Sequence, residues 1–112
     1  MLAKKYRLAA DKDFTRLFKK GRSFHGNGMS VRLVRNSLSE SRFAFVVSVK
    51  VSKKAVVRNK LRRRLREMVA KWIPDIKSGY DVAVLTKPQA IGMTSEELRK
   101  SLEFLFKKAQ LH

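Results

Sequence analysis

The stretch KKAVVRNKLRRRLREMVAKW, residues 53–72, decides the fold of this chain. At about 100° per residue, its apolar side chains fall within an arc of about 80° on a helical wheel. These side chains are Val57, Leu61, Leu65, Met68 and Trp72. The spacing predicts an amphipathic helix from about Ala55 to Ile73, which Pro74 ends. We expect its apolar stripe to pack on the core of the domain.

The opposite side of this predicted helix is cationic. It carries Arg58, Asn59, Arg62, Arg63 and Arg66, and the stripe is flanked by Lys60 and Arg64. Guanidinium groups suit phosphate oxygens and also stack on bases, while the Asn59 amide suits a sugar, a base edge or its own backbone. Solvated charged faces normally mix Glu with Lys, yet Glu67 is the only acid nearby. The pattern therefore favours a nucleic-acid-binding face over a solvated face or a nuclear-localisation segment.

Charge over the whole chain supports the same interpretation. The 112 residues include 27 Lys and Arg against 9 Asp and Glu, a net charge of +18. Residues 50–66 hold nine of these cations and no acid, whereas residues 67–112 are nearly neutral. Such self-repulsion is relieved by a polyanion, and we expect nucleic acid rather than an anionic membrane. The length predicts one RNA-binding domain over residues 1–112, with residues 1–10 as a basic and extended N-terminal arm.

Several classes of protein chemistry are not expected. The absence of cysteine excludes disulfides, Cys-ligated metals and a cysteine nucleophile. His25 and His112 are the only histidines, and acids are scarce where the chain is basic, so we predict no catalytic residue and no metal site. We also expect no cofactor in the protein, no small-molecule substrate and no membrane span. The cysteine usage fits a cytoplasmic location.

Outward from the central helix, the sequence predicts the order α-β-β-β-α-β-α. Asp11 is expected to cap a short first helix, with Gly21 as a left-handed stop. Strands are expected at residues 22–25, 29–35, 42–49 and 80–86. Thr94 and Glu97 have capping-box spacing before a last amphipathic helix that runs to about Ala109. This order is typical of a single two-layer α+β domain, with helices covering one sheet.

Two aromatic residues on the first helix leave alternatives open. Phe14, Leu17 and Phe18 lie at i, i+3 and i+4, which places all three on one apolar stripe. Such a pair of phenylalanines is usually core. Beside Lys12, Arg16 and Lys19, however, the rings are also suited to stack on bases of single-stranded RNA.

Segments across the whole chain resemble one known family. Residues 53–67, KKAVVRNKLRRRLRE, resemble the signature helix of the bacterial ribonuclease P protein subunit, whose Arg-Asn-Arg motif is matched by Arg58, Asn59 and Lys60. Residues 4–8 with 13–21, and residues 80–88 with 96–102, resemble the family in the same order. The resemblance implies a left-handed crossover around the central helix, against the usual rule.

The resemblance also implies a function. The protein would be an auxiliary subunit of a hydrolase whose RNA component cleaves precursor tRNA and releases the 5′ leader, with magnesium on that RNA. Its partners would be the catalytic RNA and precursor tRNA. The expected contacts to the catalytic RNA are Lys53, Lys54, Arg58, Asn59, Lys60, Arg62, Arg63 and Arg66. The expected leader contacts are Phe14, Phe18, Arg32, Lys50 and Lys87.

Two other functions compete with this hypothesis. One is a small basic ribosomal or ribosome-assembly protein, which has a similar fold and a basic helix. The other is an independent metal-dependent nuclease. Pre-tRNA processing with added catalytic RNA distinguishes them, because only the auxiliary subunit stimulates leader removal without cleaving RNA alone.

Overall fold

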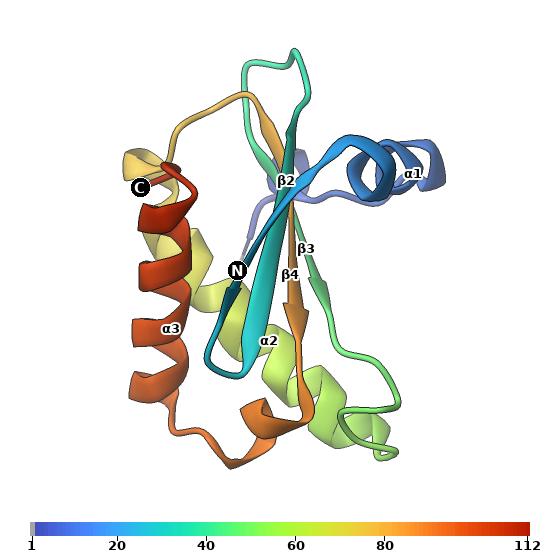
Figure 1. The fold of residues 1–112 in the computed structure, drawn as a ribbon, viewed down its shortest axis with the longest axis vertical. Helices are drawn as coiled ribbons and strands as arrows, with labels where there is room; N and C mark the ends of the chain where they lie inside the picture. The colour runs from blue at the N-terminus through green and yellow to red at the C-terminus, as the bar shows by residue number, and fades with distance from the viewer. Residues whose placement is uncertain (1) are drawn as a thin grey trace.

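The computed structural model describes residues 2–112 and has the predicted order of elements (Figure 1). The helices are α1 (Asp11–Lys20), α2 (Ala55–Trp72) and α3 (Ser95–Lys108). The strands are β1 (Arg22–Gly26), β2 (Met29–Arg35), β3 (Arg42–Val46) and β4 (Tyr80–Thr86). Three short 3₁₀ helices complete the chain: η1 (Lys4–Tyr6), η2 (Ile73–Asp75) and η3 (Pro88–Gly92).

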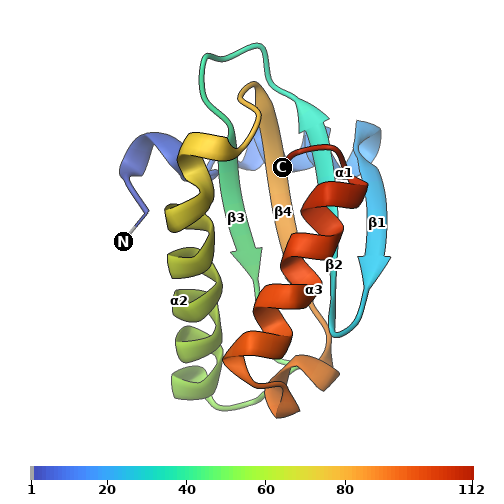
Figure 2. The same cartoon turned by 90° about the vertical axis from the view of Figure 1, so that its left-hand side faces the viewer.

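The four strands form one mixed sheet in the order β1-β2-β4-β3. β4 lies in the middle, antiparallel to β2 and parallel to β3. In Figure 2, β3 and β4 both run downwards, β4 lies to the right of β3, and α2 returns on the viewer's side. This arrangement is a left-handed crossover, which confirms the expectation drawn from the family resemblance and departs from the right-handed rule.

The two faces of the sheet are covered unequally. α2 and α3 lie together over one face and bury the larger core, which includes Phe43, Val82 and Phe106 (Figure 2). α1 lies on the other face, near one end of the sheet, over a small cluster of Leu8, Leu17 and Ala83 (Figure 1). The α1 face therefore keeps more of its side chains open to solvent than the α2 and α3 face.

The N-terminal arm is packed against the domain and includes one helical turn. Leu2 and Leu8 are buried, η1 makes a single turn, and Arg7 forms a parallel bridge with Phe43 of β3. Two apolar side chains spaced along the arm are enough to fix it against the domain. Within the described part of the arm, residues 2–10, the extended conformation predicted for residues 1–10 is wrong at η1, whereas Ala3, Arg7 and Ala10 are extended.

Several predicted boundaries were confirmed and others were wrong. Residues 29–35 and 80–86 are strands as predicted, and Thr94 makes a full capping box with Glu97. β3 ends at Val46 rather than at residue 49. Ala10, not Asp11, occupies the N-cap of α1.

Gly21 ends α1 for a reason other than the one predicted. Its φ is −73°, so no left-handed conformation is involved. A Cβ at this position would lie 2.3 Å from the Leu17 carbonyl oxygen and 3.1 Å from that of Leu33. Glycine is required here mainly because a Cβ would collide with the last turn of α1 itself, and the close approach of β2 adds a second tight contact.

Candidate nucleic-acid interface

The exposed face of α2 gathers cations without acids. Asn59, Lys60 and Arg63 are exposed, and Arg62 and Arg66 are half-buried along their stems. With Val56 these five side chains line a shallow hollow of about 440 Å³ that contains no carboxylate. Arg62 donates a hydrogen bond to the Asn59 side-chain oxygen. We call this surface the α2 basic face.

The buried stripe of α2 is rotated from its predicted position. Leu61 and Leu65 are buried as expected, but Val69 is the third buried residue, while Val57 is only half-buried. At 100° per residue the centre of the stripe moves by about 40° towards Arg58. Arg58 accordingly lies beside the core and donates from Nη1 to the Ser52 carbonyl oxygen at 2.9 Å. It holds the loop before α2, besides being a candidate RNA contact.

Of the lysines predicted to contact RNA, Lys60 lies in this face and the other four lie outside it. Lys50, Lys53 and Lys54 are exposed in the loop between β3 and α2, and Lys54 occupies the N-cap of α2. Lys87 is half-buried at the start of η3. The structure thus places three of these lysines beside the N-terminal end of the arginine helix and Lys87 at the end of β4.

The two phenylalanines of α1 differ from each other. Leu17 between them is fully buried, as predicted. Phe14 is half-buried and packs against the small cluster around Leu17, whereas Phe18 is 44% exposed. The ring of Phe18 therefore lies at the surface, whereas the ring of Phe14 lies partly in the core and partly at the surface.

Arg32 is engaged within the protein. Its Nε donates to the Leu17 carbonyl at 3.0 Å and its Nη2 to the Phe18 carbonyl at 2.7 Å. Its Nη1 donates to Ser23 Oγ at 2.5 Å, and the guanidinium carbon lies 5.9 Å from the centre of the Phe18 ring. These bonds satisfy the last carbonyls of α1. Arg32 therefore positions α1 and Phe18, and its predicted contact to a leader stays a prediction.

A second hollow joins the two groups of predicted site residues. It has a volume of about 290 Å³ and is lined by apolar side chains of the arm, α1 and β3, including Phe14 and Val46. Its cations are Arg7 from the arm and Arg66 from α2. Phe14 and Arg66, 52 positions apart in sequence, thus face one space. We call it the α1–β3 hollow.

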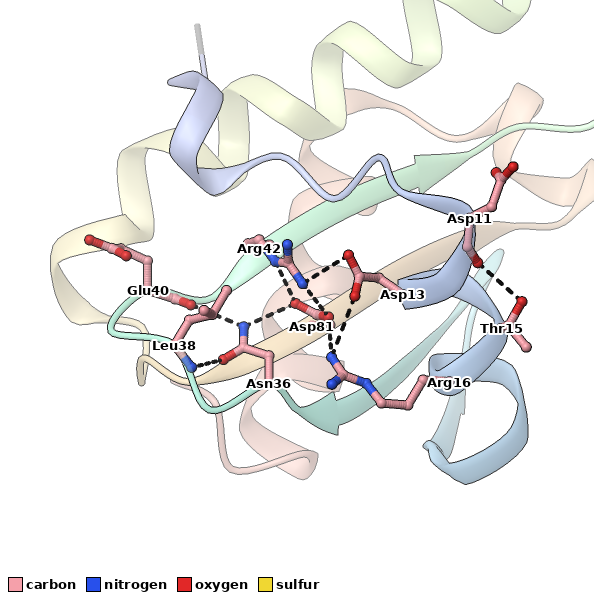
Figure 3. A network of polar contacts seen from close by, with 9 residues as sticks. All are labelled: Asp11, Asp13, Thr15, Arg16, Asn36, Leu38, Glu40, Arg42 and Asp81. Atoms are coloured by element: carbon pink, nitrogen blue, oxygen red, sulfur yellow. Dashed lines mark hydrogen bonds and ion pairs between the residues drawn. The ribbon is translucent and has the colours of Figure 1, made fainter.

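A buried ionic network fixes α1 to the sheet, and the sequence analysis did not predict it (Figure 3). Asp81 of β4 is fully buried and accepts two hydrogen bonds from Arg42, at 2.9 and 2.8 Å. It accepts two more, from Arg16 at 2.8 Å and from Asn36 at 2.9 Å. Asp13 of α1 adds an ion pair with Arg42 at 3.2 Å. The sequence signal was a single acid inside an otherwise apolar strand.

The network determines the ionisation of its central carboxylate. Burial by itself would raise the pKa of Asp81, but hydrogen bonds from Arg42, Asn36 and Arg16 and the charge of Arg42 hold that pKa below its ordinary value. The hydrogen bond to Asp81 in turn raises the pKa of Arg42. Both groups therefore stay charged at neutral pH.

The described residues offer no other obvious chemistry. Within residues 2–112, no group of three or more His, Cys, Asp or Glu side chains is placed to hold a metal ion. None of the helices in that range is long and apolar enough to cross a membrane.

Comparison with known proteins identifies the family. The model of the family described as Ribonuclease P matches residues 2–110. The chain belongs to the ribonuclease P protein family. The ribonuclease P protein component of Synechocystis sp. is 38% identical over 109 residues, covering 96% of this chain and 88% of that protein. The component from Syntrophomonas wolfei is 33% identical, covering 99% and 92%.

Solved structures of ribonuclease P proteins agree with this fold. A mutant of the Staphylococcus aureus protein superimposes with a TM-score of 0.91 at 32% identity, covering 97% of this chain and 92% of that one. The Thermotoga maritima protein superimposes with a TM-score of 0.83 at 30% identity, covering 91% and 96%. The chain is thus a protein component of a ribonuclease, and its family implies an RNA partner in a ribonucleoprotein.

Proposed function

We propose that this protein binds the catalytic RNA of ribonuclease P through the α2 basic face and the 5′ leader of precursor tRNA through the α1–β3 hollow. It thereby assists hydrolytic removal of the leader in the cytoplasm, while the RNA carries the catalysis and its magnesium. The observation that supports this proposal most directly is the row of arginines on α2 that faces no carboxylate. Because this surface has no anion of its own, the phosphate groups of RNA are suitable partners for its arginines.

The leader assignment rests on the open side of the sheet. Phe18 is exposed, Phe14 and Arg66 line one hollow, and Lys50 lies in the loop that follows β3. Aromatic rings beside cations bind single strands by stacking and charge together. The hollow is open rather than enclosed, which suits a flexible strand better than a small molecule.

The proposal is tested with the reconstituted complex of protein and catalytic RNA. We expect Phe18→Ala to weaken binding of precursor tRNA by about 5-fold or more, since a stacked base contributes roughly 1–3 kcal/mol. Binding of mature tRNA, which has no leader, should stay unchanged. Phe14→Ala should lower both precursor affinity and stability, because Phe14 is half-buried.

Leu17→Ala is the matched control on the same helix. Leu17 is fully buried, so its loss should lower the melting temperature and affect both tRNAs equally. If Phe18→Ala also weakens binding of both tRNAs equally, the leader does not contact Phe18. If the protein leaves precursor processing unchanged and binds ribosomal RNA tightly, the function is that of a ribosomal or assembly protein.

A further inference from the structure

A groove on the other long edge of α2 shares Val56 and Lys60 with the α2 basic face, and its other lining residues are not used by the function proposed above. It lies between the first half of α2 and η3 and has a volume of about 330 Å³. Its walls are Val56, Val57 and Leu61 from α2 with Ala90 and Ile91 from η3, and its cations are Lys60 and Arg64. We call it the α2–η3 groove.

Two of the five apolar side chains that form this groove are open to solvent. Val56 is 79% exposed and Ile91 is 45% exposed, although both are β-branched residues that normally favour burial. Open apolar side chains beside a strongly charged helix mark a contact surface rather than a solvated face. The packing of α2 on the core does not require them, because Leu61, Leu65 and Val69 already supply the buried stripe.

The charges beside the apolar walls indicate which kind of molecule would bind in the groove. No carboxylate lines the groove, and within the described residues neither Lys60 nor Arg64 takes part in an ion pair. A partner must therefore present a flat or apolar group and an anion close together. A nucleotide has this composition, with a base for the apolar walls and a phosphate for the cations.

We propose that the α2–η3 groove holds one unstacked nucleotide of the catalytic RNA, with its base against Val56 and Ile91 and its phosphate on Lys60 and Arg64. The proposal rests on the proposed function. The catalytic RNA is favoured over the leader because Arg64 points about 160° away, around the helix, from Arg66 of the α1–β3 hollow. Lys60 and Val56 line both the groove and the α2 basic face, so one RNA can cover both surfaces.

Site-specific crosslinking tests the position of the nucleotide. The chain has no cysteine, so an Ile91→Cys variant carries a single thiol for a photoreactive probe. In the complex with catalytic RNA and precursor tRNA, we expect a crosslink to one position of the catalytic RNA. Leu38→Cys is the control, since Leu38 is 48% exposed in the loop between β2 and β3. It should give no crosslink at that position.

Affinity measurements test the energetic role of the groove. We expect Val56→Ser with Arg64→Gln to weaken binding of the catalytic RNA about 5- to 100-fold, the range for loss of one stacked base. Arg64→Gln alone should reduce the salt dependence of log K by about 0.7–0.9, one phosphate. The preference for precursor over mature tRNA should not change, because the leader lies elsewhere.

The outcomes separate this inference from the proposed function. If the wild-type protein binds no catalytic RNA, the proposed function fails and the groove proposal fails with it. If the wild type binds while both groove variants bind equally well, only the groove proposal is overturned. A crosslink from Ile91→Cys to the leader, to a second protein or to nothing also overturns it. Ile91→Ser, which leaves α2 untouched, repeats the affinity test if the Val56 variant folds poorly.

Discussion

Two groups of arginines in this protein stand in opposite surroundings. Arg16 and Arg42 converge on the buried carboxylate of Asp81, with hydrogen bonds of 2.8–2.9 Å. Arg62 and Arg63 of α2 line a hollow that contains no carboxylate at all. The side chain is the same in both places, and the difference lies in whether the protein itself supplies the anion.

That difference separates structural arginines from binding arginines. A guanidinium that already holds a buried carboxylate contributes to folding, and its removal leaves a buried charge without a partner. A guanidinium on a surface without carboxylates is repelled by the neighbouring cations, and this repulsion destabilises the protein until an anionic partner binds. Arg32 and Arg58, which donate to backbone carbonyls, belong with the structural group despite their positions beside the candidate sites.

The largest effect is expected at the centre of the network. Asp81→Ala removes the central anion of the network and leaves Asp13 as the remaining carboxylate beside Arg16 and Arg42. It should lower the free energy of unfolding by about 3 kcal/mol, as measured by urea denaturation. Glu103→Ala on α3 is the matched control, because Glu103 pairs with Arg99 at 2.6 Å on the surface. An exposed pair contributes only about 0–1 kcal/mol. Similar losses of stability in the two variants would contradict the structural role of the Asp81 network.

Acid titration gives the next largest effect. The folded-state pKa of Asp81 lies below its ordinary value. The contribution of Asp81 to the free energy of unfolding is therefore fully present above the unfolded pKa of about 4. It is lost as the pH falls through the lower folded pKa. We expect the free energy of unfolding to fall with pH in this range, and to fall less steeply in Asp81→Asn. Equal slopes in wild type and variant would remove Asp81 from the acid response.

A smaller effect is expected at the start of α2. Arg58→Ala removes the hydrogen bond to the Ser52 carbonyl and should lower the free energy of unfolding by about 1 kcal/mol. Asn59→Ala, one position further on an exposed side chain, should change stability by less than about 0.5 kcal/mol. Calorimetric melting of both variants checks this. If both leave the melting temperature unchanged, Arg58 belongs with the binding arginines.

The smallest change in stability is expected at the α2 basic face, where we expect the clearest change in RNA binding. Replacing Arg62, Arg63 and Arg66 with Ala should change the free energy of unfolding by less than about 0.5 kcal/mol, because surface positions contribute little and the Arg62–Asn59 hydrogen bond is exposed. The log–log salt dependence of RNA binding should flatten by about 0.7–0.9 for each phosphate that the variant no longer neutralises. Titrations at several salt concentrations measure it. An unchanged slope would exclude the α2 basic face from the RNA interface.

Local patterns in the sequence were enough to predict most of the fold. The apolar patterns of residues 29–35 and 80–86 placed β2 and β4 correctly, and the Thr94 capping box placed the start of α3. The apolar spacing in α2 predicted its length within one residue but not its rotation. Val57 and Val69 lie at opposite edges of the apolar stripe of α2. Packing of the helix against β3 and α3, which the local sequence does not reveal, determines that Val69 and not Val57 is fully buried.

The parts that the sequence did not predict depend on residues far apart. Asp81 meets Arg42 and Arg16, which are 39 and 65 positions away, so no local spacing reveals the network. The α1–β3 hollow likewise joins Phe14 to Arg66. Arg32 is a residue type suited to an RNA contact, and only the three-dimensional structure shows that each of its three nitrogens already donates a hydrogen bond within the protein.

The position of β4 has a consequence for how the chain folds. β4 is the last strand in the sequence but occupies the middle of the sheet, between β2 and β3. During synthesis from the N-terminus, the first three strands therefore emerge with a gap that nothing fills until residue 86 is made. Pairings over such separations are slow because the intervening loop must close first. The arginine helix is thus complete, and open to polyanions, before the sheet that supports it.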